Sequence, residues 1–288
     1  MNYRNSDALV STEWLAAHLS APDVRVVDAT WLMPHVKRNA RAEYEACHIP
    51  GAVYFDIDEI ADTESTLPHM LPSAEKFASR VRKLGLGDGN RIVVYDSNGG
   101  FSAAARVWWM FRLFGHEDVA FLNGGLPKWL AEDRPVEDIP PVPQDRHFTP
   151  RVNNFLVRDA QHLIKNIDSG KEQVVDARTA DRFAGTGAEP RPCRKKGHIP
   201  GSVNLPFMTL LDQDNHLTFR SADEISKAME TAGVDTSKPM VTSCGSGVTA
   251  AVLTLGFFLL GHEDVAVYDG SWSEWGDHYD TPVVGPSS

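Results

Sequence analysis

The sequence predicts an α/β protein of two similar domains, each a mainly parallel sheet with helices on both faces. Three observations support this fold class: duplicated motifs, short apolar segments that alternate with helical ones, and a proline-rich stretch near the middle. The chain has 288 residues, a length that suits two domains of ordinary size.

The duplication is carried by three motifs that recur in the same order and at nearly the same separation. They are HIPGAV at 48–53 and HIPGSV at 198–203, GHEDVA at 115–120 and again at 261–266, and VVDA at 26–29 and again at 174–177. A repeat this long indicates two related domains and not a solenoid of short units.

The junction between the two copies is predicted near residue 145. Residues 137–150 contain four prolines and few apolar side chains, a composition typical of extended linkers. We therefore expect domains at 1–144 and 145–288.

Each half alternates strand-like and helix-like segments, as expected for parallel strands joined by helices. The expected strands are 24–27, 91–95, 119–122, 173–175, 239–243 and 265–268, and the expected long helices are 102–114 and 248–260. In such sheets ligands bind at the carboxyl ends of the strands. Cys244 directly follows one of these ends.

Cys244 is the candidate nucleophile. It opens the run Cys244-Gly245-Ser246-Gly247-Val248-Thr249 between an apolar strand and an apolar helix. Glycine and serine allow the backbone to curl tightly, and a helix N-terminus directs backbone N–H groups at an anion. Such surroundings favour a reactive thiolate, and the N–H groups of residues 245–250 are expected to hold an anionic persulfide.

The first copy lacks this nucleophile. When the GHED motifs are aligned, Asn98 stands at the position of Cys244, Gly99 at that of Gly245, and Gly100 at that of Ser246. We therefore expect the first domain to shape the substrate site, and the active site to face the cleft between the domains.

Composition limits the partners. The net charge of -11 argues against nucleic acid and anionic membranes as partners, because both require a basic surface. The most apolar stretch, 248–260, is too short to span a bilayer. The three cysteines form no CxxC motif, so a reduced, cytoplasmic protein is expected. We find no cofactor motif and no cluster of metal ligands.

These motifs resemble those of the tandem-domain rhodanese family of sulfurtransferases. The resemblance rests on the repeated HIPG and GHED motifs, on the Asp269-Gly270 pair followed by tryptophan, and on the cysteine loop. The loop CGSGVT is similar to the family branch that uses 3-mercaptopyruvate. The thiosulfate branch typically carries two basic residues, as in CRKGVT, where this chain has Gly245 and Ser246.

The resemblance implies roles for further residues. Arg182 and Arg191 would bind the carboxylate and ketone of 3-mercaptopyruvate, and Asp58, His69 and Ser246 would form a relay near Cys244. The loop residues Gly245, Gly247, Val248 and Thr249 would contact the substrate. The acceptor of the sulfur would be thioredoxin, a small thiol or cyanide.

Three alternatives remain open. A thiosulfate sulfurtransferase would use the same cysteine with a different donor. A cysteine phosphatase would need arginine six positions after Cys244, where the chain has Ala250. A decayed, non-catalytic rhodanese module would bind a ligand without catalysing a reaction.

Cys193 is a second cysteine of interest. It is flanked by basic residues, which would lower its pKa and suit a redox-sensing thiol.

Overall fold

A computed structural model describes residues 3–33, 35–97, 103–278 and 280–286. The strands of its first half are β1 (Leu9–Val10), β2 (Val24–Asp28), β3 (Val53–Tyr54), β4 (Arg91–Tyr95) and β5 (Val119–Leu122). Those of the second half are β6 (Val157–Arg158), β7 (Gln173–Asp176), β8 (Val203–Asn204), β9 (Leu211–Asp212), β10 (Thr218–Phe219), β11 (Met240–Ser243) and β12 (Ala266–Tyr268).

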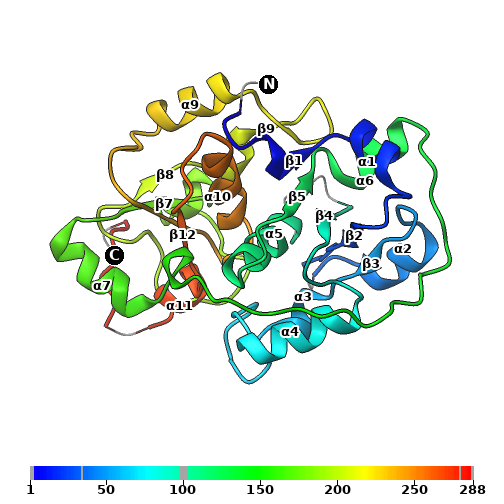
Figure 1. Cartoon of the computed structure of the whole chain (residues 1–288). Coiled ribbons are helices and arrows are strands. Elements are labelled where there is room, and N and C mark those ends of the chain that lie inside the picture. Colours follow the sequence, from blue (N-terminus) through cyan, green and yellow to red (C-terminus); the bar gives the residue numbers. More distant parts are fainter. Residues whose placement is uncertain (1–2, 34, 98–102, 279, 287–288) are drawn as a thin grey trace.

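The two halves have the same sheet topology (Figure 1). The first sheet has the strand order β1-β5-β4-β2-β3, and the second has the order β6-β12-β11-β7-β8. All of these pairings are parallel, whereas β9 and β10 form a separate antiparallel ribbon. Each strand of the first sheet thus has a counterpart in the second, which confirms the predicted fold class.

Helices and short 3₁₀ turns connect the strands. In the first half they are η1 (Ser6–Ala8), α1 (Thr12–His18), α2 (Ala40–Ala46), α3 (Ile57–Ile60), α4 (Ala74–Lys83), α5 (Ala104–Leu113) and α6 (Gly125–Ala131). In the second half they are η2 (Asn154–Leu156), α7 (Ala160–Ser169), α8 (Ala180–Phe183), η3 (Phe207–Leu210), α9 (Ala222–Thr231), α10 (Ala250–Leu259) and α11 (Ser271–Trp275).

Both faces of each sheet are covered, because successive strand side chains point to opposite faces. On β4, Val93 and Tyr95 share an apolar cluster with α1, α2 and α6, whereas Ile92 and Val94 share one with α4 and α5. The second sheet packs against α7 and α11 on one face and against α9 and α10 on the other.

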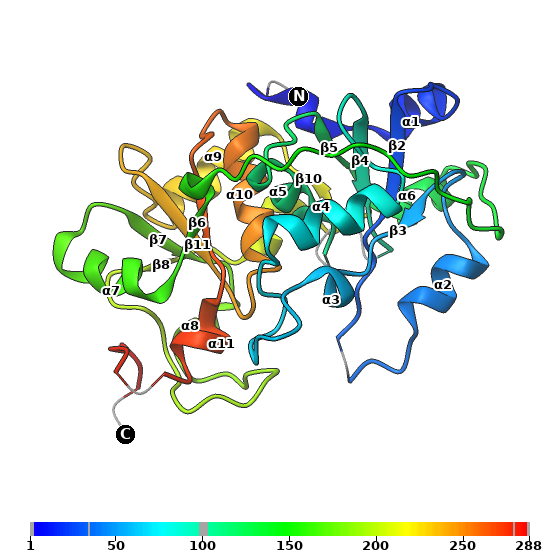
Figure 2. The ribbon, with the colours of Figure 1, turned by 60° about the horizontal axis from the view of Figure 1, so that its bottom comes forward.

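The two halves meet through α5 and α10, the equivalent helices of the duplication, which lie side by side (Figures 1 and 2). Every residue of α10 is buried, so this helix is apolar on all sides. The ring centres of Trp108 and Phe258 lie 5.3 Å apart. The guanidinium carbon of Arg112 lies 4.0 Å from the ring centre of Phe258. One apolar cluster therefore runs through both halves.

Two segments cross between the halves. The N-terminal Arg4 donates its backbone N–H to the carbonyl of Leu259 at the end of α10. Residues 133–153 run over the first half (green in Figure 1), where Phe148 is buried and Arg151 bonds to the carbonyl of Phe114. The domain boundary at residue 145 stays a prediction.

No helix in the described part of the chain is both long enough and apolar enough to cross a bilayer.

The contact between α5 and α10 predicts the effect of a truncation. We expect Phe258→Ala to lower the free energy of unfolding by about 3–5 kcal/mol, because the lost ring leaves a cavity beside Trp108 and Arg112. Urea unfolding followed by circular dichroism measures this change. The matched control Phe155→Ala removes a ring that is 74% exposed and should change stability by less than about 0.5 kcal/mol. Equal losses for the two variants would contradict the proposed importance of this interface.

Candidate active site

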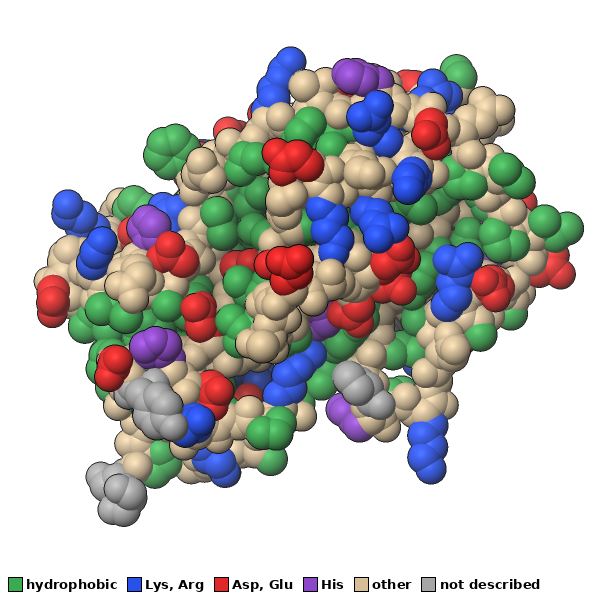
Figure 3. Space-filling model, turned by 90° about the horizontal axis from the view of Figure 1, so that it is seen from below, with side chains coloured by type: hydrophobic (Ala, Val, Ile, Leu, Met, Phe, Trp, Pro, Cys, Tyr) green, Lys and Arg blue, Asp and Glu red, His purple; other side chains and the backbone are tan. Residues whose placement is uncertain are grey.

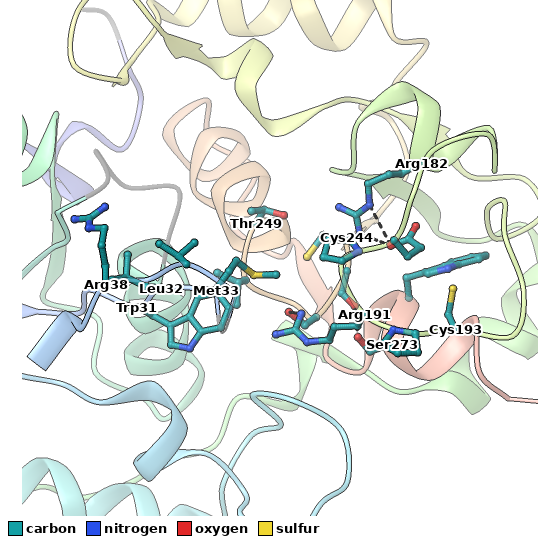
Figure 4. A pocket seen from close by; sticks show the side chains of 18 residues that line it. Trp31, Leu32, Met33, Arg38, Arg182, Arg191, Cys193, Cys244, Thr249 and Ser273 are labelled. Carbon is teal, nitrogen blue, oxygen red and sulfur yellow. Dashed lines mark hydrogen bonds and ion pairs between the residues drawn. The ribbon is translucent and has the colours of Figure 1, made fainter.

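Cys244 lies in a cavity of about 290 Å³ between the two halves (Figure 4). One wall comes from the segment after β2 in the first half and includes Trp31, Leu32 and Met33. The opposite wall comes from the second half: the cysteine loop, the segment 189–193 and the start of α11. The candidate nucleophile therefore faces the cleft between the domains, as the missing cysteine in the first copy led us to expect.

The cavity concentrates positive charge within an acidic protein. Its charged lining residues are Arg38, Arg182, Glu189 and Arg191. By contrast, acidic and basic side chains are interspersed over the outer face shown in Figure 3. The excess of arginine over glutamate in the lining favours the binding of a small anion in the cavity.

The backbone of the cysteine loop is held from behind by α11. The N–H of Trp272 donates to the carbonyl of Cys244 at 3.0 Å, and that of Ser273 donates to the carbonyl of Gly245 at 2.8 Å. In a trans peptide the carbonyl and the following N–H point in opposite directions. The N–H groups of Gly245 and Ser246 therefore point away from α11.

These loop N–H groups are available for a ligand. Among the described residues, none accepts a hydrogen bond from the backbone N–H groups of residues 245–250. The N–H of Cys244 itself is taken by the hydroxyl of Ser271 at 3.2 Å. α10 begins at Ala250, so the loop also lies at the positive end of a helix dipole. This is the geometry expected of a site for an anionic sulfur.

Arg182 reaches the cysteine loop from α8. Its guanidinium bonds to the carboxylate of Glu189, which also accepts from Arg178 at 2.8 Å. A Cβ atom on Gly245 would lie 3.0 Å from Nη2 of Arg182. The guanidinium therefore lies against Gly245, and a side chain at position 245 would have to displace it.

Arg191 connects the residues expected to form a relay. Its Nη1 donates to the hydroxyl of Ser246 at 3.2 Å, and its Nη2 donates to Nε2 of His69 at 3.1 Å. Nδ1 of His69 lies 2.9 Å from one carboxylate oxygen of Asp58, a close contact without good hydrogen-bond alignment. The indole N–H of Trp31 donates to the other oxygen at 2.8 Å. The structure therefore inserts Arg191 between His69 and Ser246.

The contact with Arg191 determines the protonation of His69. A guanidinium only donates, so Nε2 accepts and the proton of the neutral ring lies on Nδ1, facing Asp58. Burial lowers the pKa of His69 below 6.5, and the charges of Arg106 and Arg191 add to this against the effect of Asp58. Partial burial of Asp58 is outweighed by its contacts with His69, Trp31 and Arg191, so its pKa lies below 3.8. The pair is thus a neutral imidazole beside a carboxylate.

Electrostatics also link Arg191 to the nucleophile. Burial lowers the pKa of the Arg191 guanidinium, whereas the nearby charges of Cys244 and Asp58 raise it. Guanidinium groups remain protonated at physiological pH despite such shifts. Arg191 therefore places a permanent positive charge close to the sulfur.

The other predicted loop residues have different positions. Val248 and Thr249 line the cavity. Gly247 instead forms the turn behind them with φ +76°, and a Cβ atom there would lie 2.4 Å from Nη1 of Arg106. Asn98 falls outside the described residues.

Four residues at the site were missed by sequence reasoning: Trp31, Arg106, Glu189 and Asp269. Trp31 closely follows the carboxyl end of β2, a position that favours ligand contacts. Arg106 is a charged residue within an apolar helix, and Asp269 belongs to the repeated segment before the tryptophans. These signals for Trp31, Arg106 and Asp269 were present in the sequence, but the partners of the three residues lie far away in the chain. Glu189 pairs with the nearby Arg178 and Arg182.

The expectation of a lowered pKa for Cys193 was wrong. Burial raises its pKa above the ordinary value instead of its basic neighbours lowering it. Arg194 pairs with Asp277 at 3.2 Å, and Lys195 donates to the carbonyl of Thr281 at 2.6 Å, so both cations have partners of their own. The structure therefore does not support an unusually acidic thiol at Cys193, although this residue lines the cavity.

Known proteins share this sequence and architecture. The chain is 44% identical to human 3-mercaptopyruvate sulfurtransferase over 273 residues, which cover 93% of this chain and 91% of the relative. It is 43% identical to rat thiosulfate sulfurtransferase over 274 residues, with the same coverage of 93% and 91%. The crystal structure of SseA from Escherichia coli, a 3-mercaptopyruvate sulfotransferase, matches with a TM-score of 0.84 and 38% identity. The match covers 92% of this chain and 98% of SseA.

The family model of the rhodanese-like domain matches twice, at residues 11–132 and 159–278. Each match contains four of the five strands of its sheet, and the edge strands β1 and β6 lie directly before the matched ranges. The chain therefore belongs to the rhodanese family, with one family domain in each half.

Proposed function

We propose that this protein transfers sulfur from 3-mercaptopyruvate, through a persulfide on Cys244, to a thiol or cyanide acceptor. The observation that carries the proposal is the combination of a cysteine at the start of a loop whose N–H groups have no acceptor among the described residues with two arginines and a neutral Gly245-Ser246 pair. A small anion that bears a carboxylate and a thiol matches this charge distribution.

The reaction has two stages. The Cys244 thiolate attacks the thiol sulfur of the donor, an S–S bond forms, and the C–S bond breaks. The electron pair of that bond leaves as the enolate of pyruvate, which then takes a proton. An acceptor thiolate next attacks the outer sulfur and releases the Cys244 thiolate. Such a sequence gives ping-pong kinetics.

The arginines bind and orient the donor. A planar guanidinium makes paired hydrogen bonds to a carboxylate, and Arg182 and Arg191 both lie beside the cysteine loop. Arg191 and the hydroxyl of Ser246 are joined at 3.2 Å, so they can stabilise negative charge on the enolate oxygen together. We infer that the enolate forms on this side of the cavity.

Asp58 and His69 have a positioning role in this scheme. His69 accepts a hydrogen bond from Arg191 through Nε2, and Asp58 holds the Nδ1 tautomer that makes this possible. The relay thus fixes the direction of the Arg191 guanidinium and does not contact Ser246 through the imidazole.

Thiosulfate is the second candidate donor. Relatives named for either donor match this chain at nearly the same identity. The loop itself favours 3-mercaptopyruvate, because two additional cations would be better suited to a dianion. We propose thioredoxin, a small thiol or cyanide as the acceptor of the sulfur. We also propose that the protein acts in the cytoplasm, which fractionation of cells would test.

Comparing the two donors tests the function directly. We expect kcat/KM to be at least about tenfold higher with 3-mercaptopyruvate than with thiosulfate, and Cys244→Ser to abolish pyruvate release. Mass spectrometry after exposure to donor should show an addition of ~32 Da on the Cys244 peptide, one sulfur atom. Cys47→Ser is the control and should retain activity. Pyruvate release by Cys244→Ser, or a preference for thiosulfate, would contradict the proposal.

Donor preference should depend on the two neutral loop residues. In Gly245→Arg/Ser246→Lys the new side chain at 245 displaces Arg182, and the hydrogen bond from Arg191 to Ser246 is lost. We expect the ratio of kcat/KM for thiosulfate to that for 3-mercaptopyruvate to rise about tenfold or more. Ser246→Ala is the matched control, which should weaken the use of 3-mercaptopyruvate without improving that of thiosulfate. An unchanged ratio in the double variant would exclude this basis of selectivity.

The neutral state of His69 predicts an acid limit to activity. Protonation would make Nε2 a donor and repel Arg191, so kcat/KM should fall toward acid, at pH values below the ordinary pKa of histidine because burial lowers the pKa of His69. In His69→Asn the activity should be lower, and this fall should largely disappear. Asparagine is chosen because residue 69 has φ 60°, a region that asparagine tolerates. An identical acid limb in the variant would show that another group controls it.

A further inference from the structure

Arg106 is a fully buried charge in the domain without a nucleophile. It lies on α5, where the surrounding residues are apolar, and none of its side-chain surface is exposed. Its guanidinium carbon lies 4.7 Å from the ring centre of Trp109, which supports its flat face. Burying a guanidinium is costly, so its partners indicate what the position achieves.

The partners of Arg106 are parts of the candidate active site. Nη2 bonds to the carboxylate of Asp269 and to the backbone carbonyl of His69, and Nη1 lies 3.4 Å from the carbonyl of Gly247. The other oxygen of Asp269 accepts from the N–H of Leu71 at 2.8 Å. One ion pair thus joins the His69 segment of the first half to the cysteine loop of the second.

The bond to Gly247 orients a loop amide. Because Arg106 holds this carbonyl, the N–H of Val248 in the same trans peptide points away from Arg106, and Val248 lines the cavity. The fit is close, since a Cβ atom on Gly247 would lie 2.4 Å from Nη1 of Arg106 and 3.0 Å from the carbonyl oxygen of Asp269. In the cysteine loop, α11 therefore holds the carbonyls of Cys244 and Gly245. Arg106 of the first domain holds the carbonyl of Gly247.

We propose that Arg106 and Asp269 are positioning residues that align the Cys244 loop with the His69–Arg191 side of the cavity. Neither residue lines the cavity, so they act through the loop and not on the substrate. The proposal rests on the function of Cys244 as the sulfur-carrying nucleophile. It assigns the first domain a direct influence on the chemistry, beyond forming a wall.

The test compares the buried Arg106 with the half-buried Arg112, both on α5. Arg106→Lys keeps the charge but cannot bond to three separated oxygens, whereas Arg112→Lys alters an arginine that stacks on Phe258 across the same interface. We expect Arg106→Lys to lower kcat about 10- to 100-fold with KM within about threefold, because small misalignments of reacting groups have effects of this size. Arg112→Lys should leave both constants near those of the unaltered protein.

A second readout does not depend on the donor. Iodoacetamide alkylates the thiol of Cys244 without a carboxylate, and the reaction can be followed on the Cys244 peptide by mass spectrometry. We expect its rate constant to fall at least about fivefold in Arg106→Lys and in Asp269→Asn, and to be unchanged in Arg112→Lys. If 3-mercaptopyruvate is not the donor, this measurement still tests the positioning by Arg106.

Asp269→Asn keeps the shape and the acceptor for the N–H of Leu71, so it carries the test if Arg106→Lys does not fold. Thermal unfolding of all three variants reports their stability. The proposal is overturned if Arg106→Lys and Asp269→Asn fold and alkylate at the rate of Arg112→Lys. It is also overturned if neither folds, because the pair would then serve stability alone.

Discussion

The direction of the peptide groups in residues 244–249 is the constraint on which the site depends. A thiolate or persulfide shielded from water needs N–H groups around it, and holding a peptide carbonyl fixes the direction of the N–H in the same peptide. α11 holds the carbonyls of Cys244 and Gly245, and Arg106 holds that of Gly247. The sheets and helices around the loop maintain these three contacts.

Duplication produced two domains of one topology with different tasks. The second domain supplies the sulfur directly after β11 and the arginines from the segment between β7 and β8, both beyond the carboxyl ends of parallel strands. The first supplies Trp31, the Asp58–His69 pair and Arg106. Because α5 and α10 pack along one another, these contributions are held at a fixed distance across the cavity. A domain without a nucleophile thereby becomes part of the site.

Each arginine of the site is tied to a partner before any substrate arrives. Glu189 holds Arg182, His69 and Ser246 hold Arg191, and Asp269 holds Arg106. Ordering these flexible side chains in advance reduces the entropy lost when a small anion binds. Positions 245 and 246 themselves carry no charge, which is the basis of the proposed preference for 3-mercaptopyruvate.

The sequence by itself determined the duplication, the alternation of strands and helices, and the place of Cys244 after a buried strand, because these features depend on local patterns and internal repeats. The resemblance carried by the motifs then named Asp58, His69, Arg182, Arg191 and Ser246. Only the tertiary structure decided that Arg191 separates His69 from Ser246 and that Arg106 reaches Gly247. It also decided that burial raises the pKa of the Cys193 thiol. Those outcomes depend on contacts between residues far apart in the chain, and the packing of one domain against the other brings them within hydrogen-bond distance.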